Sequence, residues 1–167
     1  FVNQLSGSSL PAPVMGRNLD NWWQQLTLAR GQSDGVKVGD IVMAPGGLVG
    51  RVEDISDRTS RVLLISDPTS RVGVMLSRTR QMGVLRGTSS QTAILEFFDK
   101  APQVEVKDTV VTSGLSQLYP PGLMVGYVRS VNLDASPAPQ AEVELTAPLG
   151  LLEWGVIYTY GPTATAY

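Results

Sequence analysis

Two residue types are missing from this chain: none of its 167 residues is histidine or cysteine. Their absence excludes cysteine nucleophiles, Ser-His-Asp triads, acid–base catalysis by histidine and the standard zinc sites. Disulfide bonds are excluded as well, although a chain without cysteine can work in a reducing or an oxidising compartment. We therefore predict a protein that is not an enzyme and that uses no cofactor and no metal.

Charge and long apolar runs are also scarce. The 13 Lys and Arg residues nearly balance the 15 Asp and Glu residues, and no stretch gathers basic side chains between aromatic ones. We therefore expect no nucleic-acid partner and no polybasic patch for a membrane surface. No run of about 18 apolar residues is present that could span a membrane. Because the chain opens on Phe1 instead of Met, we expect a fragment of a longer protein, in which a signal or anchor can lie upstream.

What the chain does contain is typical of an all-β protein with little helix. Hydrophobic residues make up 43% of it, and 17 Gly and 11 Pro residues supply tight turns. Short apolar stretches recur between Gly, Pro and Asp, which is typical of barrels or sandwiches. The strands that we predict are 36–42, 48–52, 60–65, 72–76, 82–85, 92–97, 109–111, 124–131, 141–145 and 155–160.

The N-terminal part is less regular. Residues 1–10 are rich in Ser and Gly and indicate a loose lead-in. Segment 18–30 is the one helix candidate, and the alternative is a turn over 18–23 followed by a strand over 24–29. We favour the turn and strand, because the apolar stretch runs directly into a polar loop.

An internal repeat indicates two units of one design. The stretch VKVGDIV at 36–42 resembles VEVKDTV at 104–110. In each copy a Gly-containing strand and a final strand follow, and the second copy carries an insertion at 112–121. Two copies are too few for a solenoid, so we predict two related barrels.

Three stretches stand out in order along the chain. They are GLVGRV at 47–52 followed by TSRVLLISD at 59–67, RTRQMGVLRG at 78–87, and VTSGL at 111–115 followed by YPPGLMVG at 119–126. In this order and spacing they resemble the family of the rod shape-determining protein MreC over residues 11–160. The chain departs from the family at Lys107-Asp108, where Gly-Asp is usual, and at Met124, where Pro is common. We expect these departures to change turn and loop detail but not the fold.

The resemblance implies two small six-stranded β-barrels, similar in shape to those of chymotrypsin-like proteases but without catalysis. It implies a first barrel over 1–67, completed by a C-terminal strand within 152–167, and a second barrel over 68–151. It also implies a structural role for the motif residues Gly47, Leu48, Val49, Gly50, Arg51, Val52, Thr112, Ser113, Gly114, Pro121, Gly122, Val125 and Gly126.

The resemblance also implies a function. The family is a periplasmic scaffold of the bacterial cell-elongation machinery, which maintains rod shape by binding and regulating a peptidoglycan transpeptidase. The implied partners are a class B penicillin-binding transpeptidase, MreD, MreB indirectly through the membrane, and further copies of the protein itself. The implied location is the periplasmic domain of a single-pass inner-membrane protein, whose anchor belongs to the full-length chain only. The alternatives are a module that binds wall glycan or peptide and a periplasmic adaptor of a secretion or efflux assembly.

Several motifs invite a chemical interpretation, and each also has a simpler one. The glycines at 47–50 lack the following helix and the Lys-Ser/Thr end of a phosphate loop, so we predict a hairpin turn and a strand bend. Ser113 could be a nucleophile only with a lone base such as Lys107, and we predict instead a turn in which hydroxyls bond the backbone. The acidic residues match no calcium loop, and we predict solvated turns for Asp40, Glu53, Asp54, Asp57 and Asp67.

Aromatic and apolar residues supply the candidate binding surfaces. Trp22, Trp23 and Trp154 could stack on sugar rings, but we favour core or barrel-plug positions for them. Adjacent residues of a strand point to opposite faces, so at least one of two neighbouring phenylalanines should lie outside its barrel. The candidate protein-contact residues are Phe97, Phe98, Leu115, Leu118 and Tyr119. For the last three, which lie in the insertion, packing against the protein is an equal alternative to contact with a partner.

Overall fold

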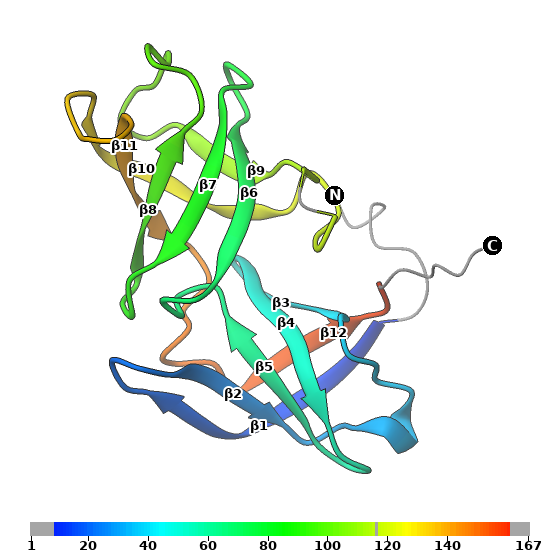
Figure 1. Ribbon diagram of the computed structural model, residues 1–167. Helices are drawn as coiled ribbons and strands as arrows, with labels where there is room; N and C mark the ends of the chain where they lie inside the picture. Colours follow the sequence, from blue (N-terminus) through cyan, green and yellow to red (C-terminus); the bar gives the residue numbers. More distant parts are fainter. Residues whose placement is uncertain (1–8, 116, 161–167) are drawn as a thin grey trace.

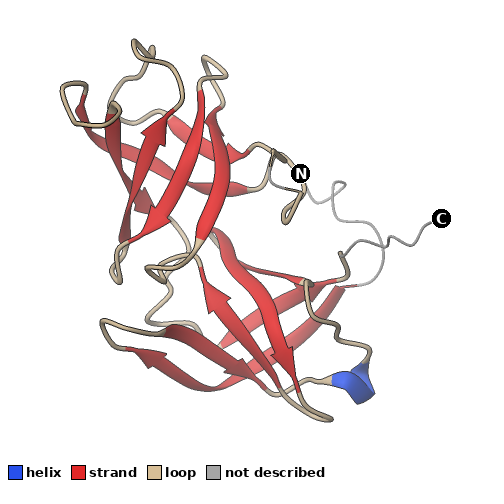
Figure 2. Ribbon diagram, viewed as in Figure 1, coloured by secondary structure: helices blue, strands red, loops and turns tan. Residues whose placement is uncertain are grey.

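A computed structural model describes residues 9–115 and 117–160 of the protein (Figure 1). These residues form strands and loops, with a single turn of 3-10 helix, η2 (Gln32–Asp34) (Figure 2). Within these ranges no helix has the length and apolar character to cross a membrane. Most of the predicted lead-in, residues 1–8, and the end of the predicted C-terminal segment, residues 161–167, lie outside the described residues.

The strands form two closed barrels of six antiparallel strands each, which confirms the predicted all-β fold. Barrel 1 contains β1 (Ser9–Leu19), β2 (Gln24–Leu28), β3 (Ile41–Ala44), β4 (Gly47–Ile55), β5 (Ser60–Leu64) and β12 (Trp154–Tyr158). Barrel 2 contains β6 (Arg71–Leu76), β7 (Met82–Gly87), β8 (Thr92–Phe97), β9 (Thr109–Thr112), β10 (Met124–Asn132) and β11 (Gln140–Leu145).

Each barrel is filled by the alternate side chains of its strands. In β2, Gln24, Leu26 and Leu28 point inward and are buried, while the residues between them are half-buried. In β8, Ala93 and Leu95 are inaccessible to solvent. A period of two is the pattern of a strand with one face in a core, and it explains why these stretches could be assigned from sequence.

The N-terminal prediction of a turn and a strand in place of a helix is confirmed, since β2 covers Gln24–Leu28. The turn is shorter than predicted, because Asn18 and Leu19 belong to β1. The Asp20 carboxylate explains the turn. It accepts hydrogen bonds from the backbone N–H groups of Trp22 at 2.8 Å and Trp23 at 2.7 Å. A short acceptor side chain that bonds the backbone two or three residues ahead favours a turn over helix.

The predicted strand over 36–42 is wrong for its first five residues, because β3 begins only at Ile41. Residues before it form a turn in which the Asp40 carboxylate accepts the N–H of Lys37 at 2.9 Å. The second copy of the repeat has the same turn, where Asp108 accepts the N–H of Glu105 at 2.8 Å. The alternating valines suggested a strand, but the Asp side chain supplies a competing local hydrogen bond.

Candidate functional site

The glycine motif of barrel 1 lies at the junction between the two barrels. Gly46 and Gly47 form the turn between β3 and β4, with φ angles of +104° and +151°. A Cβ atom on Gly47 would lie 2.7 Å from the carbonyl oxygen of Met124, at the start of β10. A larger residue would therefore push the barrels apart, and the motif explains close packing between them rather than phosphate binding.

A second contact across the junction joins motif residues that are far apart in sequence. Tyr119, from the insertion of barrel 2, is buried, and this burial raises the pKa of its phenol to about 12. The Arg51 guanidinium of β4 lies beside the hydroxyl and partly opposes that rise. The junction thus brings GLVGRV and YPPGLMVG together, although no local pattern predicted their contact.

The insertion is closed on itself by hydrogen bonds from Thr112. Its buried hydroxyl donates to the carbonyl of Pro120 at 2.7 Å and accepts from the N–H of Leu123 at 2.8 Å. The Ser113 hydroxyl accepts from the N–H of Leu115 at 3.2 Å. Hydroxyls bonded to the backbone are what we predicted here. Ser116, within the predicted insertion, lies outside the described residues.

Lys107, the base considered for Ser113, lies far from it along the chain. Lys107 precedes β9 and Ser113 follows it, so Asp108 and the four residues of that strand separate them. At about 3.3 Å per residue the strand alone spans roughly 13 Å, far beyond the distance for proton transfer. The geometry therefore gives no support to nucleophilic chemistry at Ser113.

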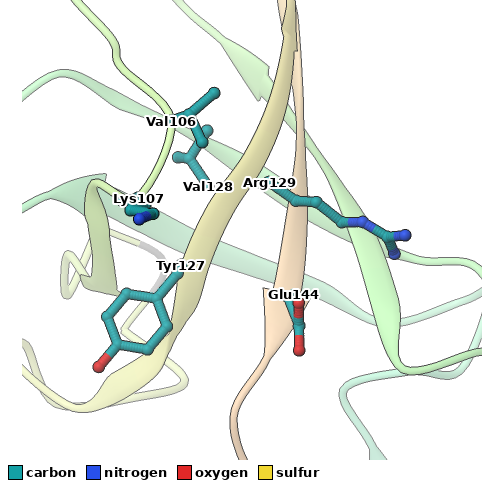
Figure 3. A pocket seen from close by; sticks show the side chains of 6 residues that line it. All are labelled: Val106, Lys107, Tyr127, Val128, Arg129 and Glu144. Carbon is teal, nitrogen blue, oxygen red and sulfur yellow. The ribbon is translucent and has the colours of Figure 1, made fainter.

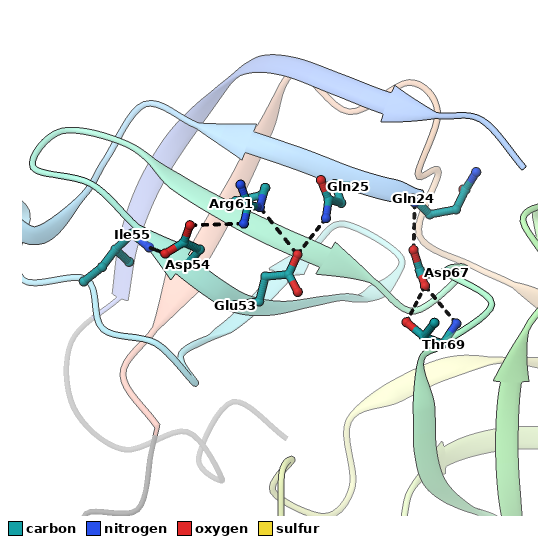
Figure 4. Close-up of polar contacts among 8 residues, drawn as sticks. All are labelled: Gln24, Gln25, Glu53, Asp54, Ile55, Arg61, Asp67 and Thr69. Atoms are coloured by element: carbon teal, nitrogen blue, oxygen red, sulfur yellow. Dashed lines mark hydrogen bonds and ion pairs between the residues drawn. The ribbon is translucent and has the colours of Figure 1, made fainter. Parts of the chain in front are cut away.

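Two of the acidic residues are buried, which contradicts the prediction of solvated turns for them. Asp67 accepts hydrogen bonds from the N–H of Gln24 at 2.8 Å and from the hydroxyl of Thr69 at 2.6 Å (Figure 4). Asp40 is also buried and bonds the backbone of its own turn. Burial of a carboxylate requires such donors, so both residues organise turns. Across residues 9–115 and 117–160, acidic residues form no group that could hold a metal ion.

The candidate protein-contact residues divide into two sets. Phe97 and Tyr119 are buried in the core and offer no surface to a partner. Phe98, Leu115 and Leu118 are exposed. The prediction that one of the two adjacent phenylalanines lies outside its barrel is confirmed, since Phe98 is 58% exposed and Phe97 only 3%.

The tryptophans lie on the surface, so the favoured core or plug positions are wrong. Trp22 and Trp23 occupy the turn between β1 and β2, and Trp154 begins β12. Trp22 is the most exposed of them, at 79%. A cluster of apolar residues on a tight hairpin turn has no barrel interior to enter, which is why only the fold could decide this point.

A groove on barrel 2 was missed by sequence reasoning. It has a volume of about 430 Å³ and is lined by Val106, Lys107, Tyr127, Val128, Arg129 and Glu144. Figure 3 shows Val106, Lys107 and Tyr127 on the same side of β10. The repeat held one usable signal, because an aromatic residue, Tyr127, stands where the first copy has Arg51. An outward aromatic on a strand is a common feature of contact surfaces.

An ion pair holds the turn that forms one wall of this groove. Arg78 donates two hydrogen bonds to Asp108, from Nε at 2.7 Å and from Nη2 at 2.9 Å. These bonds, with the N–H of Glu105, hold the pKa of the Asp108 carboxyl below its usual value. The bidentate geometry fixes the position of the turn through Val106 and Lys107.

Comparison with known proteins places these features in a family. Residues 14–159 match the family model described as rod shape-determining protein MreC, barrel core. The cell shape-determining protein MreC of Cereibacter sphaeroides is 37% identical over 131 residues, which cover 78% of this chain and 42% of that protein. The chain spans less than half the length of the curated relatives that it matches.

Solved structures share the fold. The crystal structure of MreC from Pseudomonas aeruginosa has a TM-score of 0.86 and 26% identity, covering 92% of this chain and 100% of that one. A chain in the complex between penicillin-binding protein PBP2 and MreC from Helicobacter pylori has a TM-score of 0.70. It is 16% identical and covers 90% of this chain and 97% of that one, so it supports the fold alone.

Proposed function

Since this chain belongs to the MreC family of cell shape-determining proteins, we propose that it is a non-catalytic scaffold that binds a class B penicillin-binding transpeptidase of cell elongation. The family assignment groups it with shape-determining proteins and not with adaptors of secretion or efflux. The scaffold acts by position and by affinity: it shifts a partner's conformational equilibrium by as much as it prefers one state over the other.

The observation that carries the proposal is the match of residues 14–159 to the MreC barrel core. A protein with the same barrel fold has been solved in complex with PBP2. The surface chemistry is consistent with it, since apolar side chains lie exposed on both barrels, at Trp22 and Trp23 and at Tyr127 and Phe98. Exposed aromatic groups are typical anchors of protein interfaces. The lack of histidine and cysteine supports a role without catalysis.

The proposal extends to location and to further partners. We place the domain in the periplasm, as part of a single-pass inner-membrane protein. MreD, MreB through the membrane, and further copies of the protein are the other partners that the family resemblance implies. These assignments rest on the family and not on a surface of this chain.

The test is a binding measurement between the 167-residue chain and the periplasmic region of the transpeptidase from the same organism. We expect saturable binding at or below tens of micromolar, which is typical of a transient complex. The control for non-specific adhesion is the same transpeptidase region in a denatured form, whose spectrum is no longer native. No binding at tens of micromolar would contradict the proposal.

The exposed tryptophans favour one second candidate, a module that binds wall glycan. Indole rings stack on sugar faces, and Trp22 and Trp23 are free of the barrel core. Titration with soluble wall fragments should then quench Trp fluorescence saturably, and a Trp22→Ala variant should lose that response. A Trp154→Ala variant distinguishes the hairpin from the other exposed indole.

A further inference from the structure

The two barrels differ at one strand edge. In barrel 1 the segment 31–39 lies along the outer edge of β4 and is bonded at both ends. At one end the N–H of Gly39 donates to Val52 at 2.8 Å; at the other, the N–H of Gln32 donates to Ser56 at 2.9 Å. The chain thus covers this edge with its own backbone, which is a common way to protect an edge strand.

In barrel 2 the corresponding segment leaves the edge open. The N–H of Lys107 donates to Val128 at 2.7 Å, as Gly39 does to Val52. The second contact has no counterpart, because the segment turns away and its Gln103 carbonyl accepts from the Thr79 hydroxyl. Across the described ranges, β10 from Arg129 to Asn132 pairs with β11 only.

The groove shown in Figure 3 begins where this edge becomes unpaired. Val106 and Tyr127 give it an apolar wall, and both side chains are about half exposed or more. Arg129 lies 3.9 Å from Glu142. Lys107 makes no ion pair with any residue of 9–115 or 117–160, so it is the cation left for an incoming carboxylate.

We propose that the β10 edge at Arg129–Asn132 and this groove receive an extended segment of the partner transpeptidase, which adds to the sheet as a further strand. Its backbone bonds the open edge, an apolar side chain packs on Tyr127 and Val106, and an acidic side chain faces Lys107. In barrel 1 the equivalent strand edge is covered by a polypeptide segment, residues 31–39. We therefore expect the ligand of the barrel 2 edge to be a polypeptide as well. The inference rests on the proposed function and names the surface that performs it.

Two variants test the groove against a matched control. Tyr127→Ala removes the apolar wall, and we expect the complex with the transpeptidase region to weaken by about tenfold or more. Lys107→Glu reverses the charge at this position. We expect its affinity for the transpeptidase region to be about fivefold lower and no longer to decrease as the salt concentration is raised. Val38→Ala, at the exposed position of barrel 1 that corresponds to Val106, should bind within about twofold of the original chain. Thermal unfolding of each variant confirms that the barrels are intact.

Amide hydrogen exchange tests the added strand directly. In the complex, the outward-facing amides among residues 129–132 should exchange at least about tenfold more slowly, as amides in a strand ladder do. One outcome is that the original chain binds, both variants bind equally well and the exchange of these amides is unchanged. In that case the inference is wrong and the proposed function stands. If the original chain does not bind, both fail. If the variants reduce self-association alone, the occupant is a second copy and the inference is again wrong.

Discussion

Barrel 1 and barrel 2 have the same order of strands around the ring, but the chain begins and ends each ring at a different strand. Followed from β3, the ring of barrel 1 reads β3-β4-β5-β2-β1-β12, and that of barrel 2 reads β9-β10-β11-β8-β7-β6. The place of β6, which opens barrel 2, is held in barrel 1 by β12, the last strand of the chain. Barrel 2 is thus closed by consecutive strands, whereas barrel 1 closes only after the chain has passed through barrel 2.

Equivalent positions keep their geometry but not their chemistry. Both rings bulge at the same place, after Val52 in β4 and after Val128 in β10. The bulged residue forms an ion pair in each: Glu53 with Arg61 at 3.5 Å, and Arg129 with Glu142 at 3.9 Å. The signs of the charges are reversed, which shows that the backbone of the repeat is retained while its surface has diverged.

The largest expected effect comes from removing β12. A chain that ends at residue 151 loses Trp154–Tyr158, which pairs with both β1 and β3. We expect barrel 1 to lose cooperative unfolding, because two strand edges and the cavity left by Ile157 open to water. Barrel 2 should keep dispersed amide signals in an NMR spectrum.

A chain that ends at residue 160 retains β12 and serves as the control for this truncation. If barrel 1 keeps its native NMR signals without β12, the return of the chain is not what closes it.

The next largest effect should come from the junction. Gly47→Ala places a Cβ against the Met124 carbonyl at a φ of +151°, and we expect a loss of about 2 kcal/mol in the free energy of unfolding. Denaturant unfolding measures it, and separate transitions for the two barrels would show that the junction couples them. Gly16→Ala is the matched control, because nothing lies within 4 Å of its Cβ position.

A smaller effect separates the two repeat turns. Gly39 and Lys107 both have left-handed backbones, with φ of +99° and +80°. Lys107→Gly should raise the free energy of unfolding by about 0.5–1 kcal/mol, because a side chain is costly in that region. Gly39→Lys should lower it by a similar amount. Opposite signs in urea unfolding would support one turn in both barrels, and a destabilising Lys107→Gly would contradict it.

The smallest effect concerns the pH dependence of barrel 2. The folded pKa of Asp108 lies below its ordinary value because Arg78 donates to it, so this carboxylate contributes stability above its unfolded pKa, about 3.9. That contribution is lost as the pH falls through the folded pKa. Arg78→Ala should raise the Asp108 pKa in a carboxyl NMR titration, and Arg129→Ala should leave it unchanged. An Asp108 titration that Arg78→Ala does not move would assign the low pKa to the backbone bond alone.

Local chemistry allowed much of the fold to be predicted from the sequence. The period-two pattern predicted β8 with the bounds that it has, and the repeat pointed to two related units. The turn before β2 was predicted because the apolar stretch that follows it runs directly into a polar loop, although the first two residues of the predicted turn, Asn18 and Leu19, belong to β1. These features depend on residues that are neighbours in the chain, so a short segment of sequence is enough to predict them.

The family resemblance added structural motifs and expected partners, which local patterns alone do not supply. It did not separate Phe97 from Phe98, or Tyr119 from Leu115, as buried and exposed. Those outcomes depend on which face of a barrel a strand presents and on what packs over a loop. The groove at Tyr127 was missed for the same reason, since its walls come from separate segments.

By itself, the sequence determined that this protein lacks the side chains of common catalytic sites, that it is built of strands, and that its halves repeat. Only the tertiary structure decided that Arg51 meets Tyr119, that Trp22 faces solvent and that the β10 edge is open. Each of these depends on residues far apart in the chain. Their contact is set by how the barrels close and pack, which no short stretch of sequence encodes.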